Sequence, residues 1–158
     1  ATIATISTNY QGNRSYLLKI LAFIFLFVGS ETLSANYAFK KKIKNVCKSY
    51  HVSVDATEFD LGKDTFSMSL ESGRNDFEMF MLVGFAAAGQ AVAHQEEMGL
   101  DNAYVPSKIE ISVIVPLSKG ESSTFIVACD SDLAISLANG ETDSAEFMKI
   151  IMKKMITL

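Results

Sequence analysis

The stretch GFAAAGQAVAHQEE, residues 84–97, decides the fold, because four different structures account for its small and apolar residues. It fits a phosphate-binding glycine loop, a membrane segment, a metal-binding helix face or a tightly packed internal helix. The phosphate loop fails because no Lys-Ser or Lys-Thr pair follows Gly84 and Gly89. A dinucleotide-binding loop also fails, since these glycines lie inside a predicted helix and not at a strand-to-helix turn.

The same stretch belongs to a longer run that predicts one helix of about 23 residues, or about 34 Å. Apolar residues fill almost every position of 77–93. Asn75 or Asp76 can cap its start, with Glu78 in the capping-box position, and Gly99 supplies a left-handed residue for its end. A run of about 17 residues is the lower limit for a membrane span. We therefore expect a buried internal helix, whose small residues let it lie close to a sheet.

Two β-hairpins are predicted, one on each side of this helix. Apolar and polar residues alternate over 52–57 and 66–70, with Gly62-Lys63-Asp64 between them. The same alternation over 109–115 and 125–129 gives the second hairpin. We expect a four-stranded, largely antiparallel sheet built from hairpins and not from βαβ crossovers, with the long helix across one face.

Shorter helices are predicted at both ends of the chain. Spacings of three and four join Phe39, Ile43, Val46 and Cys47 in a short amphipathic helix. Residues 131–138 give another helix, and a last one begins at Thr142 or Asp143, with an apolar stripe of Phe147, Ile150, Ile151 and Leu158. The predicted class is α+β, in the order α-β-β-α-β-β-α-α, with residues 36–158 as a single domain.

The N-terminal region predicts export or anchoring. Residues 20–29 contain no polar side chain and would span about 15 Å as a helix, about half of a hydrocarbon core. With Arg14 and Lys19 before them and Ala35 as a small residue at the cleavage position, residues 1–35 fit a signal peptide or an uncleaved anchor. The first dozen residues are interpreted as an upstream extension or a fragment artefact.

The charge balance argues against nucleic acid as a partner. Of 14 basic and 18 acidic residues, Arg14, Lys19 and Glu31 precede residue 36, which leaves 12 and 17 and a net charge of −5. Such an acidic domain is poorly suited to nucleic acid or an anionic membrane surface. The basic run over residues 40–48 is interpreted as a solvated helix face. Membrane contact is expected only through the N-terminal apolar segment, if it is uncleaved.

The candidate site residues are few. His94 and Glu97 lie three apart and share a helix face, so they are weak candidates for ligand binding. A zinc site needs at least one more ligand, and no HExxH spacing exists, so we predict no metal and no cofactor. Cys47 and Cys129 are a candidate disulfide, because an exported chain with an even cysteine count favours pairing. Two buried free thiols are the alternative.

Three functions remain open at this level. The first is an exported, periplasmic or extracellular, non-catalytic domain that binds a partner protein or an apolar ligand. The second is a small exported hydrolase or metal-dependent enzyme that uses His94 and Glu97, although no catalytic constellation is visible. The third is a membrane-anchored subunit of an envelope complex, held by the uncut N-terminal segment.

Overall fold

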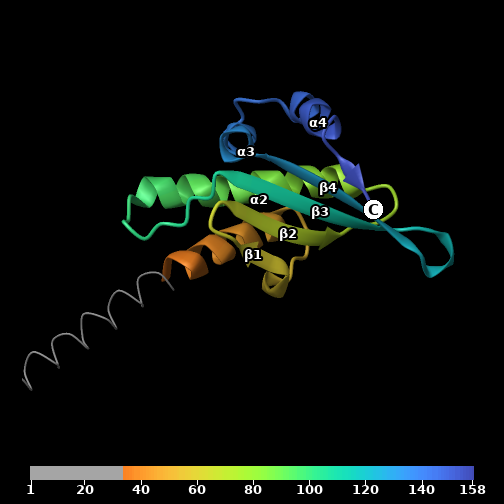
Figure 1. Cartoon of the computed structure of the whole chain (residues 1–158), viewed down its shortest axis with the longest axis horizontal. Helices are drawn as coiled ribbons and strands as arrows, with labels where there is room; N and C mark the ends of the chain where they lie inside the picture. The colour runs from red at the N-terminus through yellow and green to blue at the C-terminus, as the bar shows by residue number, and fades with distance from the viewer. Residues whose placement is uncertain (1–33) are drawn as a thin grey trace, which may run out of the picture. The chain divides into compact units, whose positions relative to one another are not determined.

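The computed structural model describes residues 34–158, in which helices pack against a five-stranded sheet (Figure 1). The predicted α+β class is confirmed. In chain order the elements are a first helix over residues 34–49, the 3₁₀ turn η1 (Ala56–Glu58), β1 (Phe59–Leu61), β2 (Thr65–Glu71), α2 (Phe77–Met98), β3 (Lys108–Pro116), η2 (Ser118–Gly120), β4 (Ser122–Asp130), α3 (Ser131–Ala138), α4 (Ser144–Met152) and β5 (Ile156–Thr157).

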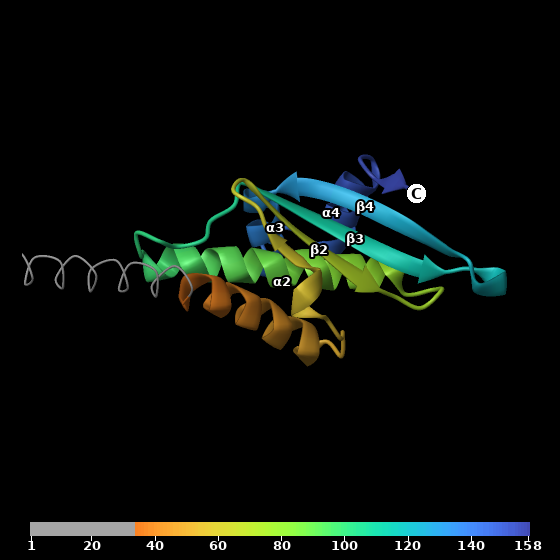
Figure 2. The same cartoon turned by 60° about the horizontal axis from the view of Figure 1, so that its bottom comes forward.

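The sheet has five strands and is mixed, so the predictions of four strands and of no βαβ crossover are wrong, whereas three of its four strand pairings are antiparallel, as predicted. The strands lie in the order β1-β2-β3-β4-β5, and β2 pairs in parallel with β3. The reason is the length of α2, which runs along the sheet in Figure 2. At about 33 Å, a 22-residue helix exceeds the roughly 23 Å of a seven-residue strand. It returns the chain to the end of the sheet where β2 began, and β3 starts there.

The first hairpin has the predicted turn but a different first strand. The strand predicted over 52–57 is wrong, because β1 is Phe59–Leu61 and pairs antiparallel with residues 66–68. The Asp55 side chain accepts a hydrogen bond of 3.0 Å from the Thr57 backbone N–H and caps η1. This local bond takes the segment away from the sheet ladder, despite its alternating pattern.

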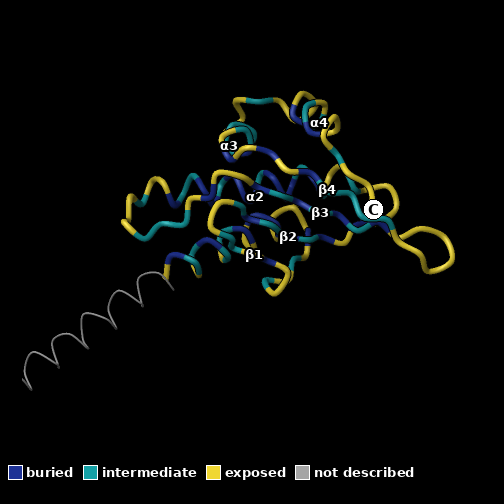
Figure 3. The backbone as a smooth tube through the Cα atoms, in the orientation of Figure 1, coloured by how far each residue is buried: buried dark blue, intermediate teal, exposed yellow. Residues whose placement is uncertain are grey.

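The second predicted hairpin is confirmed. β3 and β4 pair antiparallel, with Ile109 opposite Cys129 and Val113 opposite Phe125. Alternate residues of β2 and β3 are buried, as are Val127 and Cys129 near the end of β4, which gives the sheet one covered face (Figure 3). β5 was missed, because two residues are too short to show a pattern; it pairs with residues 125–126 of β4.

The two glycines of α2 mark its closest contacts. A Cβ added at Gly84 would lie 3.0 Å from Ile111 Cγ2 on the sheet, and one at Gly89 would lie 2.2 Å from the Ala134 carbonyl oxygen on α3. The predicted close approach to the sheet is confirmed, and α3 adds a second one. Among the described helices, only α2 is long and apolar enough to cross a membrane. Half of its most apolar 18-residue stretch is buried inside the domain.

The ends of the described chain follow their local signals. The first helix buries Phe39, Ile43 and Cys47. α4 begins at Ser144, directly after the predicted start, and the Asp143 side chain caps it by accepting a hydrogen bond from the Ala145 backbone N–H at 3.2 Å. The inclusion of Leu158 in the apolar stripe is wrong, because α4 ends at Met152 and Leu158 is 75% exposed. The predicted leader lies outside the described residues, apart from positions 34 and 35.

Candidate functional site

The helices leave an apolar groove along the side of α2 that faces away from the sheet. Met79, Ala86 and Gln90 are spaced by seven and four, so they share one helix face, about half a turn from the sheet-facing Gly84. They form the floor of a cavity of about 370 Å³. We call it the α2 groove; its lining residues are Tyr50, Met79, Leu82, Val83, Ala86, Gln90, Leu137, Ala138 and Ser144.

The walls of the α2 groove come from three other segments. Tyr50 follows the first helix, where the chain turns through His51 at a φ of 58°. Leu137 and Ala138 form the last turn of α3, which ends before Gly140 at a φ of 77°. Tyr50 is 54% exposed and Met79 47% exposed. Large apolar side chains therefore stand open to solvent at the groove instead of packing into the core.

The structure places His94 and Glu97 at the C-terminal end of α2 and brings no third ligand to them. His94 is half-buried and Glu97 is exposed. Within residues 34–158, no group of three or more His, Cys, Asp or Glu side chains could hold a metal ion. Glu97 is seven residues from Gln90, so it continues the face that forms the groove floor.

The two histidines lie near opposite ends of α2. His51 follows Tyr50, which lines the α2 groove with Leu82, whereas His94 is twelve residues further along the helix, about 18 Å. They do not share a described cavity with Cys129. The arrangement therefore offers neither a thiol and base pair nor a histidine cluster.

The predicted disulfide between Cys47 and Cys129 is wrong, because both cysteines are free and buried. The first helix packs over β2 through Phe39 and Phe66, whose rings lie 4.9 Å apart, whereas Cys129 is on β4. β3 lies between β2 and β4 in the sheet, so the strand that Phe39 contacts is not the strand that carries Cys129.

Burial also makes both thiols poor nucleophiles. It raises the pKa of Cys47 to about 11. It raises the pKa of Cys129 to about 12, and the neighbouring charge of Asp130 acts in the same direction. The thiolate is the reactive form, so at neutral pH neither cysteine has the ionisation that a catalytic thiol needs.

Alkaline pH is expected to destabilise the domain. The unfolded thiol ionises near its ordinary pKa of 9.0, while Cys47 and Cys129 stay protonated when folded. Stability is therefore fully present below pH 9.0 and is lost as the pH rises towards 11–12, by up to about 1.4 kcal/mol per pH unit for each thiol. Urea unfolding at pH 8, 9, 10 and 10.5 measures this. The Cys47→Ala variant should show a flatter dependence; an unchanged slope would contradict the assignment.

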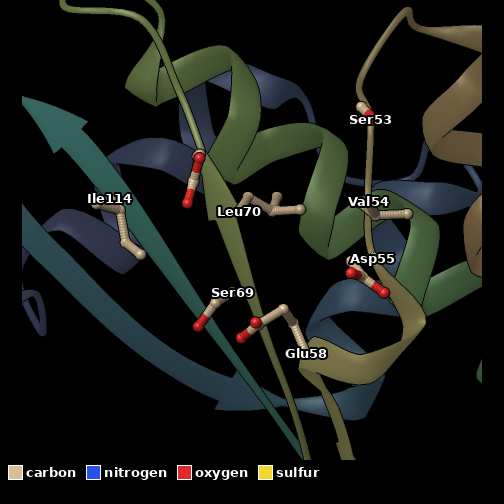
Figure 4. A pocket seen from close by; sticks show the side chains of 8 residues that line it. Ser53, Val54, Asp55, Glu58, Ser69, Leu70 and Ile114 are labelled. Atoms are coloured by element: carbon tan, nitrogen blue, oxygen red, sulfur yellow. The ribbon is translucent and has the colours of Figure 1, made fainter.

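Two polar hollows lie on either side of Ser53 and Val54. One, of about 620 Å³, is lined by Asp55 and Glu58 from the turn before β1 and by Ser69 and Ile114 from β2 and β3 (Figure 4). A hydrogen bond from the Thr57 backbone N–H, with a smaller effect of Lys44, lowers the pKa of Asp55. The other hollow, of about 580 Å³, is lined by Lys44, Lys48 and His51. The carboxylates of the first hollow and the ammonium groups of the second are exposed to solvent. Neither hollow is therefore taken as a candidate catalytic or ligand-binding site.

A buried glutamine was missed at the sequence level. Gln95 is fully buried on α2; its Nε2 donates to the Ala35 carbonyl oxygen and its Oε1 accepts from the Tyr104 backbone N–H, both at 3.0 Å. The Tyr104 hydroxyl donates to the Gly62 carbonyl oxygen at 2.8 Å. Among the described residues, no buried side-chain nitrogen or oxygen lacks a partner. Gln95 therefore joins three segments of the fold, and both polar atoms of its side chain have protein partners.

Sequence patterns could not reveal the α2 groove. The apolar positions of α2 are visible in the sequence, but Tyr50 and Leu137 come from segments that only the tertiary fold places beside them. Comparisons of the chain with protein-family models, curated proteins and solved structures gave no match. The candidate site therefore depends on the geometry of the described residues alone.

Proposed function

We propose that this chain is a non-catalytic exported domain that binds an apolar stripe of a partner protein in the α2 groove. The observation that carries the proposal is the exposure of Met79 and Tyr50 on a concave, largely apolar surface. Fully burying one large apolar side chain contributes about 1.5–3 kcal/mol. A partner that covers the exposed parts of Met79 and Tyr50 therefore gains binding free energy from both side chains.

The dimensions of the α2 groove favour a helical segment as the bound element. Its floor runs from Met79 to Gln90, eleven residues or about 16 Å of helix. That length matches three turns of an amphipathic helix, whose apolar positions recur every three or four residues. Ala86 and Ala138 keep the groove open, and the flexible Met79 side chain can adjust to the partner.

Export is proposed on the sequence of the N-terminal region. The uncharged residues 20–29 follow Arg14 and Lys19, which is the order of a secretory leader. An enzyme that uses His94 and Glu97 is less well supported, because neither a third metal ligand nor a nucleophile and base pair lies beside them within residues 34–158.

The α2 groove is tested with 8-anilinonaphthalene-1-sulfonate, a dye that fluoresces on apolar surfaces, and with a model amphipathic Leu/Lys helix peptide. Ala86→Glu places a charge on the groove floor, and we expect it to weaken binding of both probes at least tenfold. Ala128→Glu is the matched control, because Ala128 is exposed on β4. Equal binding by the wild type and Ala86→Glu would contradict the proposal. Dye binding without peptide binding would favour a small apolar ligand.

A further inference from the structure

The residue predicted to end the leader is part of the folded core. Ala35 is only 2% exposed, and its carbonyl oxygen accepts the hydrogen bond from Gln95 Nε2. It also lies within the continuous first helix, residues 34–49, and begins the compact unit Ala35–Leu158. A cut directly after Ala35 would thus remove a residue that is part of the folded core.

A cut between Ala35 and Asn36 would harm this structure in two ways. It would remove the acceptor of a fully buried amide, and a buried donor left unpaired costs about 1–3 kcal/mol. It would also create a positive α-amino group at the N-terminus of the first helix, where the helix dipole disfavours positive charge. A leader that ends before Ala35 avoids both effects.

We propose that Ala35 is retained and that the leader is removed after Ser30, so that the mature protein begins at Glu31. The proposal rests on the export proposed above. Gly29 and Ser30 are small residues directly after the apolar run, which is where such a cleavage site belongs. Val28, the third residue before the proposed cut, is also smaller than Leu33, the third residue before a cut after Ala35.

Intact mass spectrometry of the full chain, expressed in an export-competent bacterial host, tests the cleavage position. The expected mass is that of residues 31–158. A mass of residues 36–158 overturns the proposal and leaves export standing. An uncut chain in the cytosol overturns export itself, and an uncut chain in the membrane fraction overturns cleavage and favours an anchored subunit.

Matched substitutions at the two positions give a second readout that does not depend on folding. Ser30→Leu places a bulky residue at the proposed cleavage position, and we expect it to slow processing at least tenfold in a pulse-chase measurement. Ala35→Leu makes the same change at the other position and should be processed as fast as the wild type. The opposite pattern overturns the proposal.

Discussion

Replacing Gly89 by alanine should lower the free energy of unfolding by about 2–3 kcal/mol, even though alanine is the better helix former by about 1 kcal/mol. The new Cβ would lie 2.2 Å from the Ala134 carbonyl oxygen and 2.6 Å from its carbonyl carbon. These are backbone atoms of α3, so no side-chain rotation relieves the overlap. α2 and α3 must move apart, which loosens the packing of both helices. Urea unfolding followed by circular dichroism measures the effect.

Gly84→Ala is the matched control, because Gly84 is also in the interior of α2 and gains the same helix propensity. Its added Cβ would meet only side-chain atoms, with Ile111 Cγ2 at 3.0 Å and Leu70 Cδ1 at 3.2 Å. These can yield by a few tenths of an ångström, so we expect a change within about 1 kcal/mol. A Gly89→Ala variant as stable as the wild type would show that the contact with α3 is looser than the structure has it.

The two glycines also show what small residues in a sequence can and cannot predict. Their spacing within 84–97 predicts that some backbone or sheet approaches α2 closely, and both approaches exist. Spacing defines the helix face that is approached, but not the element that approaches it. The sheet follows from the fold class, whereas the position of α3 depends on how the chain returns after β4.

Strand pairing was the weakest part of the prediction for a related reason. An alternating strand buries the same side chains whether its neighbour runs parallel or antiparallel, so β2 and β3 have the same pattern in both cases. The length of α2 carried the missing information, because a helix longer than the strands returns the chain to its starting end. Over residues 52–57, a capping carboxylate outweighed the alternation.

The residue types of the candidate site could be recognised in the sequence, but their arrangement in space could not. His94 and Glu97 attracted attention through residue type, yet no third ligand lies near them among the described residues. The α2 groove has no distinctive residue types, since Met79 and Leu82 belong equally to a core. It becomes a site because Tyr50 and Leu137 flank these positions without covering them. Composition could indicate the apolar face but could not show that part of it stays open.

Gln95→Leu should destabilise the domain by about 2–4 kcal/mol, because it removes both hydrogen bonds of a fully buried amide and leaves the part-buried Tyr104 N–H without its acceptor. Leucine nearly matches glutamine in volume, so packing is largely preserved, while the Ala35 carbonyl oxygen and the Tyr104 N–H lose their hydrogen bonds. Gln90→Leu is the matched control, since Gln90 is on the same helix but half-buried in the α2 groove. We expect that variant to stay within about 0.5 kcal/mol of the wild type in urea unfolding.

Gln95→Glu separates the hydrogen bonds from the volume of the side chain. At neutral pH the carboxylate can still accept from the Tyr104 N–H but cannot donate to the Ala35 carbonyl oxygen, and burial disfavours its charge. Its folded pKa should therefore rise above the unfolded value of about 4.3, so its contribution is present below that pH and lost as the pH rises. We expect Gln95→Glu to be less stable than Gln95→Leu at pH 7 and to recover relative to it near pH 4. If the difference between the two variants does not change with pH, Gln95 does not act through the proton that it donates to Ala35.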